Sequence, residues 1–225
     1  MIVAIDGPAG SGKSTVAREL ARRLGFTYLD SGALYRTVTL LALDRGVDLD
    51  DGPALGRLAA DTKLELRERG DDYVQVIADG RDVSEEIRAP RVTVASSTVA
   101  AHPEVRAALL RKQRELIDSG DYVAEGRDIG TVVAPDAAVK LFLTADPEER
   151  ARRRADELER RGHEADAEEV QAAIEHRDML DSTRSAAPLR VAEDAVVIDT
   201  TGLEVDQVVE RAAALVDEAR ASSSS

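Results

Sequence analysis

The stretch Gly7-Pro8-Ala9-Gly10-Ser11-Gly12-Lys13-Ser14 decides the fold class of this chain. It fits the pattern G-x-x-x-x-G-K-[ST] at every defined position. Glycines let consecutive backbone N–H groups turn inward around a polyphosphate, where a Cβ would obstruct the ligand or the dihedral angles. Lys13 would reach the β- and γ-phosphates of a nucleotide, and the Ser14 hydroxyl would hold Mg²⁺. The stretch therefore predicts a phosphate-binding P-loop.

The surroundings of this loop support the prediction. The β-branched run Ile2–Asp6 reads as a buried strand, and Ser14–Leu24 has apolar residues at helical spacing. Lys13 is one of only four lysines in a chain with 26 arginines, which favours a compact ammonium inside the loop. We expect ATP to be bound by Gly7, Pro8, Ala9, Gly10, Ser11, Gly12, Lys13, Ser14 and Thr15.

Strand-like and helix-like segments alternate along the chain. The further strand candidates are Tyr28–Leu29, Tyr122–Ala124, Ala138–Leu143 and Ala195–Ile198. The further helix candidates are Ala33–Asp44, Val92–Ala101, Pro103–Ile117, Glu149–Arg161, Ala167–Leu180 and Val205–Ala219. Strands that alternate with helices imply a parallel sheet covered on both faces. We therefore predict a three-layer α/β P-loop NTPase fold with five strands, whose ligands lie at the carboxyl ends of the strands.

A change of period marks an insert in this pattern. Apolar and polar residues alternate within Leu64–Leu66 and within Val74–Ala78, on either side of the turn Arg69–Asp72. This pattern predicts a β-hairpin. We expect a single P-loop domain over residues 1–220, with a core of about 1–60 and 103–220, an insert of about 61–102, a lid within about 149–166, and a disordered tail at 221–225. Ser31 is the expected N-cap of one helix, and Asp146-Pro147-Glu148-Glu149 is a capping box for another.

Composition narrows the functional class. The formal net charge of −14 disfavours nucleic acid as a partner, and the absence of cysteine excludes disulfides, thiol nucleophiles and Cys-ligated metals. No apolar run approaches the roughly 20 residues that span a bilayer, and Met1 leads directly into a strand. We expect a monomer in the cytoplasm that contacts neither a membrane nor nucleic acid.

A P-loop alone does not separate kinases from GTPases, motors or sulfotransferases. A GTPase would need an N-K-x-D sequence to read guanine, and this chain contains no asparagine. AAA-type and ABC-type motors would need a hydrophobic strand that ends in adjacent acidic residues, and none is seen. The remaining class is a small phosphotransferase.

Several separated blocks together resemble the bacterial cytidylate kinase family. Beyond the P-loop they are Leu29–Arg36, Glu125–Thr131, Arg177-Asp178 with Asp181 and Arg184, Ala187-Pro188-Leu189, and the segment Gly80–Arg88 at the end of the hairpin insert. Any one tripeptide is weak evidence for a family, since Gly-Arg-Asp occurs here twice. The blocks taken together, in this order and at this spacing, cover nearly the whole chain. The resemblance implies that the insert binds a nucleoside monophosphate, and that ATP, Mg²⁺ and CMP or dCMP are the ligands.

A monophosphate acceptor needs guanidinium groups for its dianion and a carboxylate for its sugar hydroxyls. The resemblance implies that Arg36 and Arg127 bind the α-phosphate, whereas Arg184 either joins them or faces the transferred phosphoryl group. Arg177 and Asp181 would read the sugar, although their i,i+4 spacing also fits a surface ion pair. Lys13, Arg127 and Arg184 are the expected catalytic residues.

The base of CMP presents an N4 amine beside the N3 and O2 acceptors. By resemblance Asp128 and Ser31 would face the amine edge, and Ser97 and Arg106 the acceptors. Uracil would set a carbonyl against the carboxylate, and such an unmatched buried pair costs a few kcal/mol. We therefore expect the acceptor site to prefer cytosine over uracil.

Two features of the sequence each allow two interpretations. Asp30 either supports Mg²⁺ and its water or simply ends its strand. The Arg-rich segment 149–161 is either a charged helix balanced by its own acidic residues or a lid that closes over ATP, with Arg150, Arg153 and Arg154 as candidates.

The expected reaction is transfer of the ATP γ-phosphoryl group to CMP or dCMP. One alternative is another small-molecule P-loop kinase, such as one for a different monophosphate or for shikimate. The other is a protein that binds nucleotide without turnover.

Overall fold

The computed structural model describes residues 1–69, 73–118, 120–160, 162 and 164–223. The chain forms two compact units, of which unit 1 contains residues 1–27 and 121–225 and unit 2 contains Tyr28–Gly120. The expected insert of about 61–102 lies inside unit 2, which begins and ends well outside those bounds.

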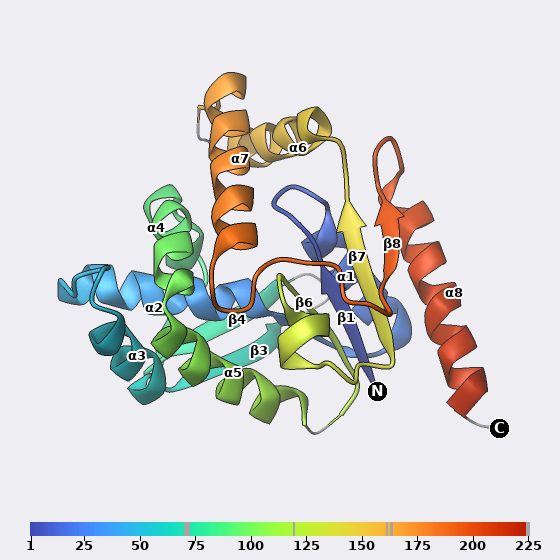
Figure 1. Cartoon of the computed structure of the whole chain (residues 1–225), viewed down its shortest axis with the longest axis horizontal. Coiled ribbons are helices and arrows are strands. Elements are labelled where there is room, and N and C mark those ends of the chain that lie inside the picture. The colour runs from blue at the N-terminus through green and yellow to red at the C-terminus, as the bar shows by residue number, and fades with distance from the viewer. Residues whose placement is uncertain (70–72, 119, 161, 163, 224–225) are drawn as a thin grey trace. The chain divides into compact units, whose positions relative to one another are not determined.

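All but one strand of a parallel sheet lie in unit 1, of which they form the centre (Figure 1). The described residues contain a five-stranded sheet with the order β2-β6-β1-β7-β8. Its strands are β1 (Ile2–Asp6), β2 (Thr27–Asp30), β6 (Tyr122–Gly126), β7 (Val139–Thr144) and β8 (Val196–Asp199). Strand β1 pairs in parallel with β6 and β7, and β7 with β8. Because β1 is central and β-branched, Val3, Ala4 and Ile5 are fully buried. The predicted fold class is confirmed.

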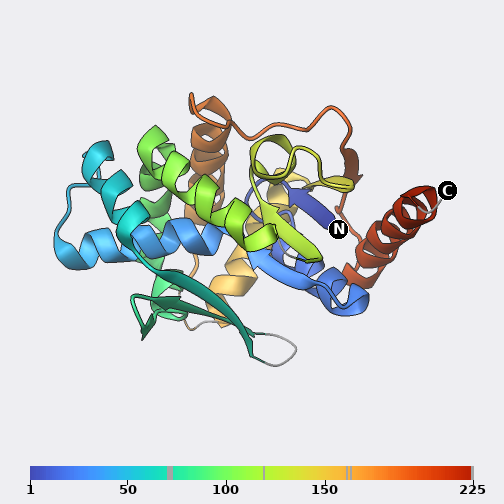
Figure 2. The ribbon, with the colours of Figure 1, turned by 90° about the horizontal axis from the view of Figure 1, so that it is seen from below.

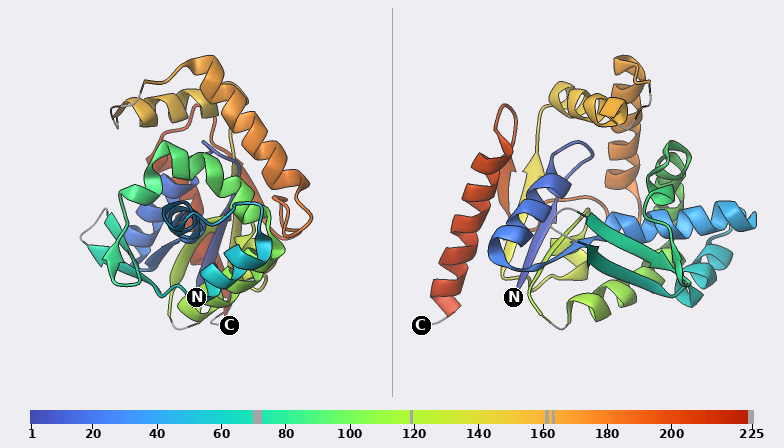
Figure 3. Two further views of the ribbon diagram at one scale, coloured as in Figure 1. Left: turned by 90° about the vertical axis from the view of Figure 1, so that its left-hand side faces the viewer. Right: turned by 180° about the vertical axis from the view of Figure 1, so that it is seen from behind.

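Two helices pack against this sheet and against each other. Helix α1 (Lys13–Leu24) contacts β1 and β6, and α8 (Val205–Ser223) contacts β7. Seen from behind, α1 and α8 lie side by side over the strands (Figure 3). Helix α8 was expected to end at Ala219 with a disordered tail from residue 221. It continues through Ser223 because nothing in the Ala-Arg-Ala-Ser sequence breaks a helix, and residues 224–225 lie outside the described residues.

Helices α6 (Pro147–Arg160) and α7 (Ala167–Thr183) cross each other after β7 (Figure 3). Helix α6 begins at Pro147, as the capping pattern predicts. The two helices share a small apolar cluster of Ala151, Val170 and Ile174, and Ala9 of the P-loop packs against it. This cluster attaches the Arg-rich helix to the phosphate-binding loop.

Unit 2 has its own core. Its helices are α2 (Ser31–Arg45), α3 (Gly52–Asp61), α4 (Pro90–Ala101) and α5 (Pro103–Ile117), with a 3₁₀ turn η1 (Glu86–Arg88). The predicted hairpin is confirmed as the antiparallel pair β3 (Leu64–Arg69) and β4 (Tyr73–Ala78), to which β5 (Arg81–Asp82) adds a third strand (Figure 2). Residues 70–72 of the predicted turn lie outside the described residues.

Candidate functional site

The P-loop connects β1 to α1 in unit 1. Helix α1 begins at Lys13, directly after Gly12 in the left-handed conformation with φ of 84°. Lys13 is only 8% exposed, and its Nζ donates to the Pro8 carbonyl at 3.3 Å. An ammonium that bonds back across its own loop lies where a polyphosphate would be wrapped by the loop and by the positive end of α1.

Two P-loop glycines are required by their neighbours in the protein. A Cβ on Gly7 would lie 2.1 Å from the Leu143 carbonyl oxygen, which belongs to β7. A Cβ on Gly10, whose φ is +75°, would lie 2.7 Å from the Arg150 carbonyl oxygen of α6. The sequence explains these glycines by the ligand and the dihedral angles, but the structure adds close backbone contacts from β7 and α6.

Ser14 and Lys13 share a buried carboxylate. The Ser14 hydroxyl donates to Glu125 Oε1 at 2.5 Å, and Lys13 Nζ lies 4.0 Å from Glu125 Oε2. Within the described residues no group of three or more His, Cys, Asp or Glu side chains can hold a metal ion. A hydroxyl beside a carboxylate fits Mg²⁺, which keeps several waters and takes its other ligands from nucleotide phosphates.

A second polar cluster of unit 1 joins the segment after β6, helix α7 and the segment after α7. Arg127 Nε donates to Asp181 Oδ2 at 2.7 Å, and Arg184 Nη1 donates to Asp181 Oδ1 at 3.3 Å. Arg184 Nη2 also lies 3.8 Å from Asp128 Oδ1. The structure thus brings together four of the predicted acceptor-site residues that belong to unit 1.

Asp181 lies at the centre of this cluster and is only 5% exposed. Burial alone would raise the pKa of Asp181, but the positive charges of Arg127, Arg177 and Arg184 hold that pKa below its usual range. The alternative of a surface ion pair between Arg177 and Asp181 is therefore wrong, because a buried carboxylate among three guanidiniums is part of an enclosed network.

The segment after α7 sets the position of Arg184. Arg184 Nε donates to the Ala187 carbonyl at 2.8 Å, and Leu189 N donates to the Asp181 carbonyl at 2.8 Å. Ala187 has a φ of 50°, a left-handed conformation that is unfavourable for a residue with a Cβ. This backbone geometry directs a carbonyl at the Arg184 guanidinium.

The three lid candidates have different surroundings on α6. Arg150 is buried, and it donates through Nε to the Ala145 carbonyl and through Nη1 to the Ala9 carbonyl and to Asp178. Arg153 donates to the Thr200 carbonyl at 2.8 Å and to the Thr200 hydroxyl at 2.9 Å. Arg154 donates to Glu157 at 2.7 Å. Arg150 anchors α6 to the P-loop, and contact of any of the three with phosphate stays a prediction.

In unit 2, Asp30 is the N-cap of α2. Its carboxylate accepts the Ala33 N–H at 3.0 Å and Arg36 Nη2 at 2.7 Å. The prediction that Ser31 is the cap is wrong, because the helix already begins at Ser31 and the neighbouring carboxylate is the better acceptor. Burial would raise the pKa of Asp30, but Arg36, the Ala33 N–H and Arg88 lower it below its usual range.

The base-reading candidates of unit 2 lie on α4 and α5. Arg106 is buried, donates through Nη1 to the Ala100 carbonyl at 3.1 Å, and stacks over the ring of Tyr35 at 5.2 Å from its centroid. Ser97 is half-buried on α4, and Ser31 is buried at the start of α2. Recognition of a base by these side chains stays a prediction.

Sequence reasoning assigned no role to three residues of unit 1 that contact the site. Glu125 accepts the Ser14 hydroxyl, Asp178 accepts the Ala9 N–H at 3.2 Å, and Asp6 accepts the N–H groups of Ile129 and Gly130, both at 2.8 Å. Each is an acidic residue at the end of a strand or next to a recognised motif residue. This position in the sequence was the signal that could have identified them as site residues.

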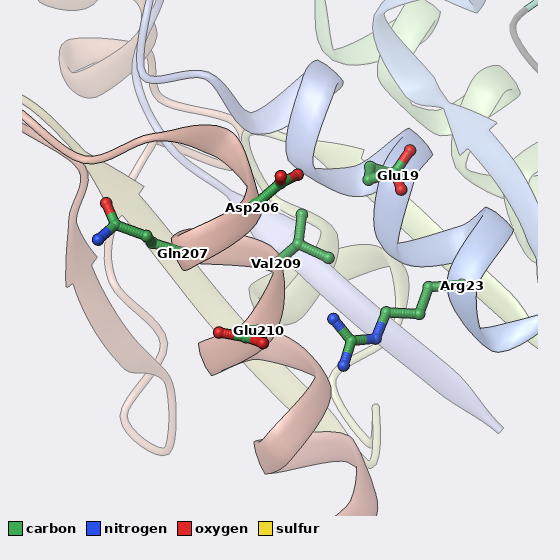
Figure 4. Close-up of a pocket in the computed structure, with 6 residues that line it drawn as sticks. All are labelled: Glu19, Arg23, Asp206, Gln207, Val209 and Glu210. Atoms are coloured by element: carbon green, nitrogen blue, oxygen red, sulfur yellow. The ribbon is translucent and has the colours of Figure 1, made fainter.

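A hollow between α1 and α8 lies apart from these residues (Figure 4). It is lined by Glu19, Arg23, Asp206, Gln207, Val209 and Glu210. No predicted site residue lines it.

Comparison with known proteins decides the family. Residues 3–218 match the sequence profile of the cytidylate kinase family. The chain belongs to the cytidylate kinase family. It is 52% identical to a cytidylate kinase of Pelotomaculum thermopropionicum over 218 residues, which are 97% of this chain and 96% of that protein. It is also 52% identical to a cytidylate kinase of Carboxydothermus hydrogenoformans over 209 residues, which are 93% and 94% of the two chains.

One solved structure shows the shared fold alone. The crystal structure of an uncharacterised protein from Eubacterium ventriosum aligns with a TM-score of 0.53 at 13% identity, over 96% of this chain and 98% of that one. The resemblance to cytidylate kinases that the separated motifs predict is confirmed, and the alternatives of a shikimate-type kinase or a binding protein without turnover are not favoured.

Proposed function

We propose that this chain transfers the γ-phosphoryl group of ATP to CMP or dCMP, giving ADP and CDP or dCDP. The observation that carries the proposal is the combination, within unit 1, of a P-loop with a buried Lys13 and a buried network of Arg127, Asp181 and Arg184. The first suits a triphosphate, and the second suits a monophosphate with sugar hydroxyls.

In the proposed reaction a phosphate oxygen of CMP forms a bond to the γ-phosphorus as the bond to the β–γ bridging oxygen breaks. That oxygen is a competent nucleophile at neutral pH, so no general base is needed. Lys13 neutralises charge on the β- and γ-phosphates, and Arg127 and Arg184 neutralise the acceptor and the transferred group. Mg²⁺, when bound, neutralises the β- and γ-phosphates, and Ser14 and Glu125 would hold it.

The acceptor specificity is proposed from charge and hydrogen-bonding capacity. Asp128 and Ser31 would accept from the cytosine amine, Ser97 and Arg106 would donate to its acceptors, and Arg36 would join Arg127 at the α-phosphate. Arg177 and Asp181 would bind the sugar hydroxyls. The buried carboxylate of Asp128 favours an amine over the carbonyl of uracil.

The decisive experiment is an acceptor panel of CMP, dCMP, UMP, AMP and shikimate in a coupled ADP-release assay at fixed ATP and Mg²⁺. We expect CMP and dCMP to be the best acceptors, with UMP at least tenfold slower in kcat/KM. Faster turnover of UMP or AMP would refute the cytosine assignment.

A pair of lysine variants tests the phosphoryl-transfer step. Lys13→Ala should lower kcat by about 10²–10³-fold, because the β- and γ-phosphates lose a buried positive charge. Lys63→Ala is the control, since that ammonium is exposed and bonds only to the nearby Glu65 among the contacts described. Equal activity of the two variants would refute the role of Lys13.

The monomeric state and the cytoplasmic location remain proposals. Within the described residues, no helix is both long enough and apolar enough to cross a membrane. Light scattering at assay concentration tests the first proposal.

A further inference from the structure

Asp6 is a buried carboxylate that the proposed reaction does not use. It is the last residue of β1, is 4% exposed, and directly precedes Gly7 of the P-loop. In the sheet it lies opposite Gly126, the last residue of β6. The two strands therefore end side by side, and the P-loop and the segment with Arg127 and Asp128 leave the sheet at the same level.

Both oxygens of Asp6 bind the segment that follows Asp128. Oδ1 accepts the Ile129 N–H and Oδ2 accepts the Gly130 N–H, each at 2.8 Å. These amides open a π-helical turn, η2 (Ile129–Val133), and both residues are buried. The carboxylate therefore satisfies two N–H groups that water does not reach, and such groups are rarely left without an acceptor.

The backbone at Gly130 lies directly against this carboxylate. A Cβ there would lie 3.5 Å from Asp6 Oδ2 and 3.2 Å from the Lys140 side chain. Lys140 is itself held by both oxygens of Asp194, each at 2.8 Å. The turn is thus confined between Asp6 and a lysine whose position is also determined.

The segment between the two attachments to Asp6 is only two residues long. Gly126 is joined to Asp6 through the strand pair, and Ile129 is joined to it through the side chain. Arg127 and Asp128 alone lie between them. A two-residue segment attached at both ends to one residue has little freedom, so its side chains keep their direction toward Asp181 and Arg184.

We propose that Asp6 is a positioning residue for phosphoryl transfer, which holds Arg127 and Asp128 in register with the P-loop. It acts through its two backbone hydrogen bonds and touches neither substrate. This inference rests on the proposed function, because it assigns Arg127 and Asp128 to the acceptor.

The test compares Asp6→Asn with Asp51→Asn. The side-chain amide of the first variant keeps one acceptor but turns an N–H toward one of the two backbone donors. Asp51 is an exposed N-cap of α3 in unit 2 that accepts the Ala54 N–H at 2.9 Å, a bond that the amide oxygen of its variant can keep, so this variant controls for the loss of a carboxylate charge. We expect Asp6→Asn to lower kcat/KM for CMP at least tenfold, with ATP affinity measured without CMP changing less than threefold. We expect Asp51→Asn to change neither.

A second variant covers the case in which Asp6→Asn does not fold. Gly130→Ala keeps the carboxylate but is expected to shift the backbone away from it, because the new Cβ would lie 3.2 Å from the Lys140 side chain, which both oxygens of Asp194 hold. We expect an effect in the same direction as that of Asp6→Asn, namely a rise in KM for CMP of at least threefold with ATP affinity retained. Two results would show that the positioning role is wrong. One is wild-type kinetics toward CMP in a folded Asp6→Asn protein, or in Gly130→Ala if Asp6→Asn does not fold. The other is an equal loss of ATP and CMP affinity in the variant that is tested.

An amide-exchange measurement separates this inference from the proposed function. In wild-type protein the Ile129 and Gly130 amides should be strongly protected, and in Asp6→Asn their exchange should accelerate at least tenfold relative to strand amides such as Ala4. This readout does not depend on which acceptor is used. If wild-type protein shows the protection but does not phosphorylate CMP, the proposed function fails while the attachment by Asp6 stands.

Discussion

The Asp178 carboxylate accepts the backbone N–H of Ala9 at 3.2 Å, so α7 bonds directly to the P-loop. The other oxygen of Asp178 binds Arg150, which in turn donates to the Ala9 carbonyl at 3.1 Å. Both backbone polar groups of Ala9 are therefore bound by side chains of α6 and α7, and its methyl group packs against their shared apolar cluster. The conformation of the P-loop therefore depends on α7 and on α6, the helix that was predicted to form a lid.

Asp178→Ala should destabilise the protein and weaken ATP binding. It removes the acceptor of the Ala9 N–H and leaves the buried Arg150 guanidinium without its carboxylate, which should cost about 2 kcal/mol in the free energy of unfolding. Urea unfolding and ATP titration measure the two effects. Asp156→Ala is the control on α6, because Asp156 forms an exposed ion pair with Arg152 that contributes well under about 1 kcal/mol. Similar losses in both variants would contradict the role of Asp178.

Gly10→Ala should weaken ATP binding at least tenfold, whereas Gly25→Ala should not. Both glycines have a positive φ, of 75° and 68°, so alanine at either costs roughly 1 kcal/mol of backbone strain. Only at Gly10 does the new Cβ meet backbone, at 2.7 Å from the Arg150 carbonyl oxygen, while at Gly25 no atom lies within 4 Å. ATP titration and urea unfolding of the pair separate steric contact from strain. Equal ATP affinity in both variants would show that α6 yields to the Cβ.

Asp6 should make stability fall as pH rises from about 4 to about 6. Burial raises the pKa of Asp6 to about 6, although the Gly130 and Ile129 N–H groups lower it; Asp128 raises it further and Arg127 lowers it. The folded state therefore binds more protons than the unfolded state between pH 3.8, the usual pKa of this carboxyl, and about pH 6. Stability is then lost as this carboxyl ionises, by on the order of 3 kcal/mol over the window.

Urea unfolding across pH 4–7 measures this effect as the difference between wild-type and Asp6→Asn proteins. The variant lacks the titrating group, so the wild-type advantage should shrink as pH rises through the window. A difference that does not vary with pH would contradict the raised pKa.

Ala187→Gly and Ala187→Val should have different effects on turnover. Glycine accepts the φ of 50° without strain, so the Ala187 carbonyl should still accept Arg184 and kcat should stay within about twofold. A β-branched residue is strongly disfavoured at this φ, so valine should displace the carbonyl, lower the free energy of unfolding by more than about 1 kcal/mol and reduce kcat. Steady-state kinetics on both proteins checks this. Normal kcat in a folded valine variant would show that the strained carbonyl does not position Arg184.

The sequence predicted well those elements whose signals are local. The P-loop, the start of α5 at Pro103, the start of α6 at Pro147 and the β3–β4 pairing each follow from neighbouring residues. Helix α3 was missed because Gly52-Pro53 reads as a turn. Its glycines instead allow close packing, since a Cβ on Gly56 would lie 2.6 Å from the Glu104 Cβ at the start of α5.

The site was predicted as a set of residue types but not as a set of contacts. Arg127, Asp181 and Arg184 could be named from motifs, whereas the bonds between Asp6 and Ile129 or between Asp178 and Ala9 join residues more than 100 positions apart. A carboxylate that accepts hydrogen bonds from the backbone amides of a distant segment has no characteristic spacing in the sequence. Sequence periodicity therefore could not reveal either contact.

The network around Asp181 also determines how an anion would be recognised there. Arg127, Arg177 and Arg184 surround Asp181, and Asp128 lies 3.8 Å from Arg184, so three positive and two negative charges nearly cancel. A cluster with so little excess charge, in a chain of net charge −14, attracts an anion weakly from a distance. Recognition must then come from guanidiniums already held in place that exchange partners at contact range. The rate at which a monophosphate associates with these residues should consequently depend little on ionic strength.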